Sequence, residues 1–210
     1  MEYKRVIRED LSDRLIHLTR ALTHKDSGNV LSAILQERQL RGGTGNIKGG
    51  YACVCFSEAP IGKLGQILAQ PMAHKVRYKP YGVMVAKEWL FRQGGRPAIY
   101  QPDVESTALP ESHRHRHVCY EPPVVDFSWE REWRIKTDAL ALDPESTTVV
   151  VPNRKWADSM RREHQAAQSR KAMLTGGLGI EVIPWHFIAL EDLGVPIPVD
   201  DPVPDPPEQS

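Results

Sequence analysis

The chain has 210 residues, of which 40% are hydrophobic and 26% are charged, enough to bury the core of one or at most two domains. Lys plus Arg and Asp plus Glu each total 27, so no overall charge excess draws the chain to nucleic acid or to an anionic membrane. The longest apolar runs fall far short of the roughly 20 residues that a membrane span needs.

Charged residues follow directly on Met1, so the N-terminus lacks the plan of a secretory signal. The three cysteines, Cys53, Cys55 and Cys119, cannot all pair with one another. Cys53 and Cys55 also lie too close in an extended segment to form a disulfide readily. We therefore expect a cytoplasmic protein with reduced thiols.

The first part of the chain mixes short strands with a helix. Residues 14–19 alternate imperfectly and predict a strand, which a turn at 26–28 follows. Asn29 is the expected N-cap of a helix whose apolar residues recur at helical spacing until Gly42 and Gly43 stop it. A glycine-rich loop over 42–50 then leads to a strand over 51–57.

Further strands are predicted over 82–86, 98–100, 117–120, 127–135 and 147–151, with a short helix over 87–93. A long polar helix follows from Arg154 to Leu174, closed by Gly176 and Gly177, and 180–184 predicts a last strand. From Val195 the sequence becomes proline-rich and acidic. We expect one α+β domain over 1–194 and a flexible tail over 195–210.

The most informative window is the segment 128–135. In a strand, the period of two would place Glu130, Glu132 and Arg134 on one face and two tryptophans on the other. Two interpretations stay open. Either the segment is an edge strand whose carboxylates pair with arginines at a solvent face, or it aims a pair of carboxylates into a cleft.

Three residues in earlier strands are further candidates. His17 lies in a strand-like apolar segment with Thr19 on the same face, so it is either a core histidine or a cleft residue that binds a hydroxyl group. Ser57 ends a strand, where its hydroxyl either caps the following turn or contacts a ligand.

The order of His17-x-Thr19, a helix, a strand ending at Ser57 and a late Glu130-x-Glu132 segment resembles the ADP-ribosyltransferase fold. Several short pieces over residues 14–136 are also similar to bacterial proteins of the AbiGi phage-resistance family: Ile16–Thr19, Ile34-Leu35, Cys55-Phe56-Ser57-Glu58, Pro80–Val83, Lys87-x-Trp89-Leu90 and Glu130-x-Glu132-Trp133-Arg134. The resemblance implies an α+β fold with two small sheets around a cleft and flanking helices.

The same resemblance implies an NAD-dependent ADP-ribosyltransferase in phage defence by abortive infection or in a toxin–antitoxin pair. NAD would be the substrate, and a nucleic acid or protein the acceptor. Transfer passes through a ribosyl cation that a fixed carboxylate stabilises, the role that the family's motif gives to Glu132. Glu130 would orient the acceptor, and His17, Thr19 and Ser57 would surround NAD. This chain departs from the family in lacking its Ser-Thr-Ser triplet.

The AbiGi resemblance also allows a catalytically silent binding protein or antitoxin of the same fold, held to a cognate partner, because members of that family are named as antitoxins. In that interpretation the Glu130–Arg134 segment is a structural ion-pair face. A third class is an RNA-binding module that uses the basic run His113–His117.

Two weaker motifs point to no specific ligand. The basic run with Cys119 lacks the second cluster that a structural zinc site needs, so we expect no metal. The glycine-rich loop fits neither the Walker A nor the dinucleotide-binding spacing. We expect it to be a flexible loop, either plain or lying over a bound dinucleotide.

Overall fold

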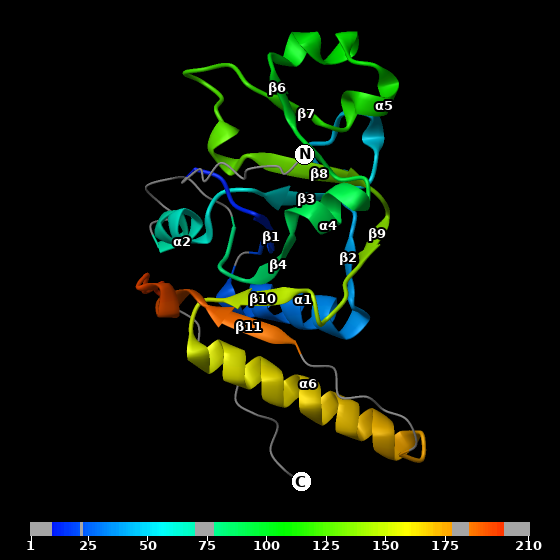
Figure 1. The fold of residues 1–210 in the computed structure, drawn as a ribbon, viewed down its shortest axis with the longest axis vertical. Helices are drawn as coiled ribbons and strands as arrows, with labels where there is room; N and C mark the ends of the chain where they lie inside the picture. Colours follow the sequence, from blue (N-terminus) through cyan, green and yellow to red (C-terminus); the bar gives the residue numbers. More distant parts are fainter. Residues whose placement is uncertain (1–9, 22, 70–77, 178–184, 200–210) are drawn as a thin grey trace, which may run out of the picture. The chain divides into compact units, whose positions relative to one another are not determined.

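The computed structural model describes residues 10–21, 23–69, 78–177 and 185–199 (Figure 1). The chain divides into two compact units, each made of three separate segments. The first comprises Met1–His17, Arg41–Leu64 and Val85–Leu140, and the second comprises Leu18–Leu40, Gly65–Met84 and Ala141–Ser210. Both contain helices and strands, which confirms the predicted α+β class. A single domain over 1–194 with a flexible tail stays a prediction.

Four antiparallel strands form the sheet of the first unit: β1 (Arg14–Leu18), β3 (Cys53–Ser57), β8 (Glu132–Lys136) and the edge strand β5 (Arg96–Pro97). Directly opposed residues share a face of a sheet, and successive residues of a strand alternate between faces. One face is therefore apolar and buried, with Leu15, Val54, Phe56, Trp133 and Ile135 between 0% and 7% exposed. The other face carries Cys53, Cys55, Ser57, Glu132 and Arg134.

A second, parallel pair of strands belongs to the same unit, β6 (Ile99–Gln101) and β7 (His117–Cys119), within a residue of the two strands predicted here. Between them run the 3₁₀ helix η2 (Asp103–Ala108) and the short helix α5 (Glu111–Arg114), neither of which was predicted. The unit also contains α4 (Lys87–Arg92) and the 3₁₀ turns η1 (Lys48–Gly50) and η3 (Ser128–Glu130).

In the second unit, β10 (Thr148–Val151) pairs antiparallel with β4 (Gly82–Ala86) and parallel with β11 (His186–Ala189). Helix α6 (Arg154–Leu174) lies along β10 and β11, followed by η4 (Leu190–Leu193) (Figure 1). Helix α1 (His24–Glu37) packs on α6. The core of this unit contains an aromatic pair, because the rings of Tyr81 and Trp156 lie edge to face at 5.0 Å and are almost fully buried.

Five elements contribute residues to both units: β1, β4, the helix α2 (Ile61–Ala69), and the paired strands β2 (Gln39–Arg41) and β9 (Ala139–Ala141).

Within the described residues, no helix combines the length and the apolar character that crossing a membrane requires.

The structure confirms the strand over 82–86 and the helix from Arg154 to Leu174, and it corrects other predicted bounds. Helix α1 begins five residues before Asn29 and ends at Glu37, well before Gly42. Strand β11 and helix α2 were not predicted. The predicted strand over 180–184 lies outside the described residues.

Candidate functional site

Ser57 and Glu132 lie on neighbouring strands of the first unit. Ser57 ends β3, Glu132 begins β8, and the register places the two residues directly opposite each other. The Ser57 hydroxyl donates to the carbonyl oxygen of Glu130 at 2.6 Å and accepts from the backbone amide of Ala59 at 3.2 Å. Ser57 thus fixes both the turn after β3 and the segment that enters β8.

Glu130 lies in a 3₁₀ turn and not in a strand. The turn η3 ends at Arg131, whose φ of 45° and ψ of 53° place it in the left-handed region, and β8 begins only at Glu132. The strand predicted over 127–135 is therefore wrong at its start. Because Arg131 interrupts the extended backbone, the alternation that would have aligned Glu130 with Glu132 does not apply.

The carboxylate of Glu132 is bound at both oxygens by Arg134. Arg134 Nε donates to Glu132 Oε1 at 2.9 Å and Nη2 donates to Oε2 at 3.0 Å. The arginine is only 5% exposed, and its Nη1 also donates to the carbonyl oxygens of His115 and His117 at 2.9 and 2.8 Å. Burial opposes the charge of Arg134, but the hydrogen bonds and charge of Glu132 outweigh it and raise the pKa of Arg134. The pair is a fixed, charge-assisted ion pair.

Two protonated side chains adjoin this ion pair. Burial, reinforced by the negative charge of Glu132, raises the pKa of the Cys55 thiol far above its ordinary value. Burial likewise raises the pKa of Tyr100 to about 12, although its hydroxyl accepts a hydrogen bond from the Glu132 backbone amide at 2.7 Å. Neither group is ionised near neutral pH, so the cluster offers no thiolate nucleophile.

His17 projects from the opposite face of the sheet. Ile16 lies opposite Ser57, so the next residue, His17, lies on the face of Phe56, and the two rings meet edge to face at 5.8 Å. His17 Nδ1 donates to the carbonyl oxygen of Cys55 at 2.8 Å. The structure therefore does not bring His17 to Glu132, because the register of β1 on β3 turns its ring away.

Thr19 belongs to the second unit. Its backbone amide donates to the Tyr81 carbonyl oxygen at 2.8 Å, and its own carbonyl accepts from the Lys79 amide at 3.1 Å. The side chain is 3% exposed, and its hydroxyl has no hydrogen-bond partner among the described residues.

A second polar network, on the face of His17 and Phe56, was missed by the sequence interpretation. The Glu58 carboxylate accepts from Lys87 Nζ at 2.6 Å and from Trp133 Nε1 at 2.9 Å. The Glu58 and Lys87 side chains are 12% and 27% exposed. The sequence held a usable signal, because Glu58 follows Phe56 by two residues and strand alternation places it on the apolar face.

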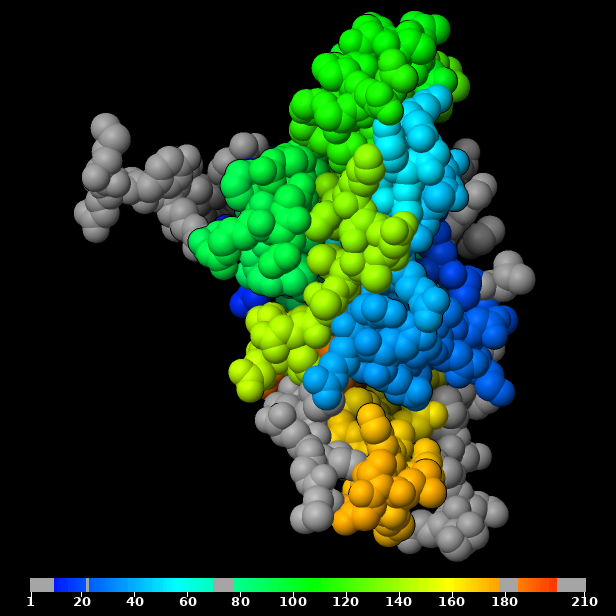
Figure 2. Space-filling model, turned by 90° about the vertical axis from the view of Figure 1, so that its right-hand side faces the viewer, coloured from blue at the N-terminus to red at the C-terminus, as the bar shows by residue number. Residues whose placement is uncertain are grey.

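The glycine-rich loop is tied to the segment around α5, and Figure 2 shows the two side by side on the surface, in cyan and green. The backbones of Gly43 and Cys53 exchange hydrogen bonds of 2.9 Å in both directions. Lys48 forms an ion pair with Asp103 at 2.7 Å. The Tyr51 hydroxyl donates to Glu111 at 3.0 Å. Two motifs far apart in the sequence, the loop and the basic run, thus meet in the fold.

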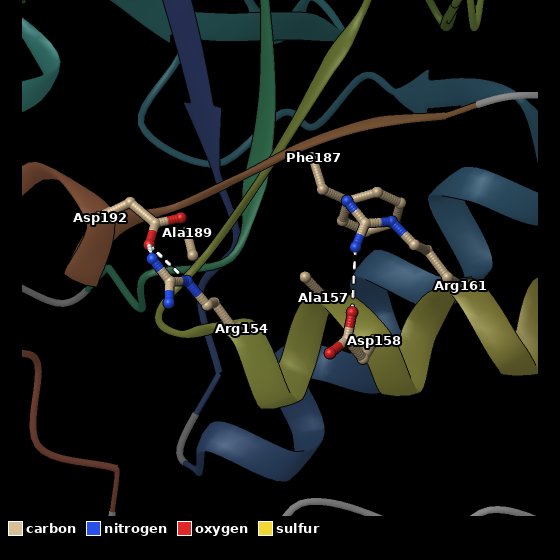
Figure 3. Close-up of a pocket in the computed structure, with 7 residues that line it drawn as sticks. All are labelled: Arg154, Ala157, Asp158, Arg161, Phe187, Ala189 and Asp192. Atoms are coloured by element: carbon tan, nitrogen blue, oxygen red, sulfur yellow. Dashed lines mark hydrogen bonds and ion pairs between the residues drawn. The ribbon is translucent and has the colours of Figure 1, made fainter.

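The second unit carries a hollow of about 210 Å³ between α6 and β11, lined by Arg154, Ala157, Asp158, Arg161, Phe187, Ala189 and Asp192 (Figure 3). Arg154 pairs with Asp192 at 2.6 Å and Arg161 with Asp158 at 3.0 Å. Each arginine is neutralised by a neighbouring carboxylate, so the hollow has no excess charge to attract an anion.

In the described part of the chain, no cluster of three or more His, Cys, Asp or Glu residues is arranged to hold a metal ion.

No protein-family model, curated protein or solved structure gives a significant match to this chain. The likeness to ADP-ribosyltransferases and to the AbiGi family stays a prediction from short sequence motifs.

Proposed function

We propose that this chain is a binding protein that engages a macromolecular partner without turning over NAD, as the antitoxin side of the AbiGi resemblance implies. The observation that carries the proposal is the engagement of both Glu132 oxygens by Arg134. A carboxylate that stabilises a ribosyl cation has to direct its charge at the substrate. Here that charge is directed at a buried guanidinium.

Releasing Glu132 toward a substrate would carry a large cost. It would leave Arg134, which is 5% exposed, without its counter-charge. Breaking a buried ion pair typically costs about 3–5 kcal/mol, because an uncompensated charge remains in the interior. The position of His17 adds to this argument, because a ligand held by Glu132 on one face of the sheet would not meet the His17 ring on the other.

ADP-ribosyl transfer is the second candidate, and one observation favours it. Ser57 and Glu132 are directly opposed, which is the juxtaposition that the resemblance implies. In this alternative Glu132 stabilises the ribosyl cation, Glu130 acts on the acceptor, and NAD is the substrate. This alternative requires one of two conditions. Either a ligand displaces Arg134 from Glu132, or the Glu132–Arg134 ion pair itself forms part of the active site.

The deciding experiment measures NAD binding by calorimetry and nicotinamide release from NAD, with and without nucleic-acid and protein acceptors. Wild type, Glu132→Gln and Glu58→Gln are compared. Glu58→Gln is the matched control, because it removes a partly buried carboxylate from the other face of the same strand pair. The proposal predicts neither binding nor release for wild type. Nicotinamide release that falls on the order of 100- to 1000-fold in Glu132→Gln alone would replace it with the transferase.

A further inference from the structure

Two arginines that form no ion pair within the described part of the chain lie at the outer edge of the first unit's sheet. Arg96 lies on the edge strand β5, directly opposite Arg134. Its Nη1 donates to the carbonyl oxygens of Phe91 and Gly95 at 2.9 and 2.7 Å. Arg116 Nε donates to the carbonyl oxygen of Pro97, also on β5, at 2.9 Å. Both guanidinium groups are thus held by backbone carbonyls, and neither has a carboxylate partner among the described residues.

Lys136 continues this charge along the neighbouring strand. It is the last residue of β8, two positions beyond Arg134 on the same face, and it is exposed. Its ammonium group lies 3.6 Å from the centroid of the Tyr51 ring. No carboxylate of the described residues forms an ion pair with it. We call Arg96, Arg116 and Lys136 the cationic row.

Two members of the row act on the same neighbour, His115, and Arg96 acts on Arg116. Burial lowers the pKa of His115, and the positive charges of Arg116, Lys136, Arg134 and His113 lower it further. Burial and then the charge of Arg96 lower the pKa of Arg116. Lys48 in the same unit offers a contrast, because Asp103 neutralises it. Like charges held together oppose folding, so an anionic ligand would relieve their repulsion.

The row is held in place by the fold. Tyr51 positions Lys136 through its ring and is itself fixed by the hydrogen bond to Glu111. Gly49, with a φ of 84°, lies so close that an added Cβ would stand 2.6 Å from the Tyr51 ring. Arg96 and Arg116 are fixed by their carbonyl acceptors. Preorganised cations lose little side-chain entropy on binding an anion.

We infer that the cationic row is a docking surface for the phosphate backbone of a nucleic-acid strand. Arg96 lies on β5, Lys136 ends β8 and Arg116 stands in the turn before β7. Three cations on three separate segments suit the repeated phosphates of a strand better than a single phosphate. Arginine and lysine are the usual ligands of nucleic-acid phosphates. The chain carries no net charge, so attraction has to come from such a local group. The inference does not depend on whether NAD is turned over.

The test measures anisotropy of labelled single-stranded RNA, single-stranded DNA and duplex DNA of about 20 nucleotides, between about 50 and 200 mM salt. Wild type is expected to bind, with affinity that falls steeply as salt rises. Each single-strand phosphate contact contributes about 0.7 to the slope of log K against log salt. The double variant R96Q/R116Q should therefore lower the slope by about 1.4 and weaken binding at least about 10-fold at low salt.

Matched controls locate the surface. R161Q/R162Q removes the same number of charges from helix α6 in the second unit and should bind like wild type. Circular dichroism checks that each variant folds. If R96Q/R116Q does not fold, Lys136→Glu, which changes an exposed side chain, provides a second test of the surface. The inference is overturned if no oligonucleotide binds at low salt, or if only the α6 variant loses binding. The inference would also be overturned if polyglutamate bound more tightly than the oligonucleotides. The same holds if inorganic phosphate or a single nucleotide bound and the oligonucleotides did not.

Discussion

At the residue scale, two charged networks flank the β3–β8 pair, one on each face. Arg134 makes four hydrogen bonds, two to Glu132 and two to backbone carbonyls, so its buried donors are well satisfied. On the apolar face, Glu58 accepts from Lys87 and from Trp133. Buried charges are tolerated only when partners of this kind satisfy them. Both networks therefore have a sufficient structural reason to exist.

We expect the stability of the protein to depend on pH through His115. Burial first, and then neighbouring positive charges, lower its pKa in the folded state, and its Nδ1 is buried without a partner among the described residues. The unfolded chain, with an ordinary pKa of about 6.5, binds the proton more readily. Stability is therefore full above that value and falls as the pH drops through the window between the unfolded and the folded pKa.

We expect His115→Gln to flatten this decline, because the amide cannot take up a proton. The measurement is the urea unfolding free energy at a pH above 6.5 and at one well below it. His113→Gln, at an exposed neighbour, is the control. His164 in the second unit also has a pKa lowered by burial and should leave a residual slope. A variant that declines as steeply as wild type would contradict the assignment to His115.

At the element scale, the sequence was informative where local signals agree. Helix α6 was predicted correctly because its polar run is closed by glycines, and the structure shows in addition that Asn153 caps its start, accepting from the Trp156 amide at 3.0 Å. The start of α1 was misplaced because Gly28 suggested a turn. The cap is Thr23, whose hydroxyl accepts from the Asp26 amide at 3.0 Å, and Gly28 lies inside the helix.

The candidate site was predictable only in part, for a similar reason. Ser57 ends β3 and Glu132 begins β8, two strands that residue types indicate, and the register places the two residues opposite each other. The sequence does not reveal the left-handed conformation of Arg131. A non-glycine residue adopts that conformation at a cost of roughly 1–2 kcal/mol, so an arginine in an alternating segment gives no reason to expect it. The face of His17 depends on the register of β1 against β3, which is a tertiary property.

Gly28 provides a test of helix packing. A Cβ added there would stand 2.5 Å from Cζ3 of the buried Trp156. Alanine is the better helix former by about 1 kcal/mol, but overpacking a core costs typically about 1–3 kcal/mol. We expect Gly28→Ala to lower the urea unfolding free energy. Gly62→Ala in α2 is the control, because a Cβ there meets open space, and it should leave stability equal or higher. Equal effects of the two substitutions would contradict this account.

At the scale of the whole molecule, the two units are interleaved along the chain. Each is made of three segments, and the chain passes between them inside β1, β2, α2, β4 and β9. Neither unit can therefore be cut out as one continuous piece. Unfolding of one unit also removes residues from elements that the other unit uses, so independent unfolding is disfavoured.

We expect the two units to unfold together, and hydrogen exchange along a urea series tests this. The amides of β3 and β8 report on the first unit, and those of β10 on the second. All should lose protection at one shared midpoint, since β1 and β4 cannot stay intact when either unit opens. Gly28→Ala, which perturbs only the second unit directly, should shift that midpoint equally for all three strands. A shift confined to β10, with β3 and β8 unchanged, would show that the units unfold separately and that the shared strands fray without coupling them.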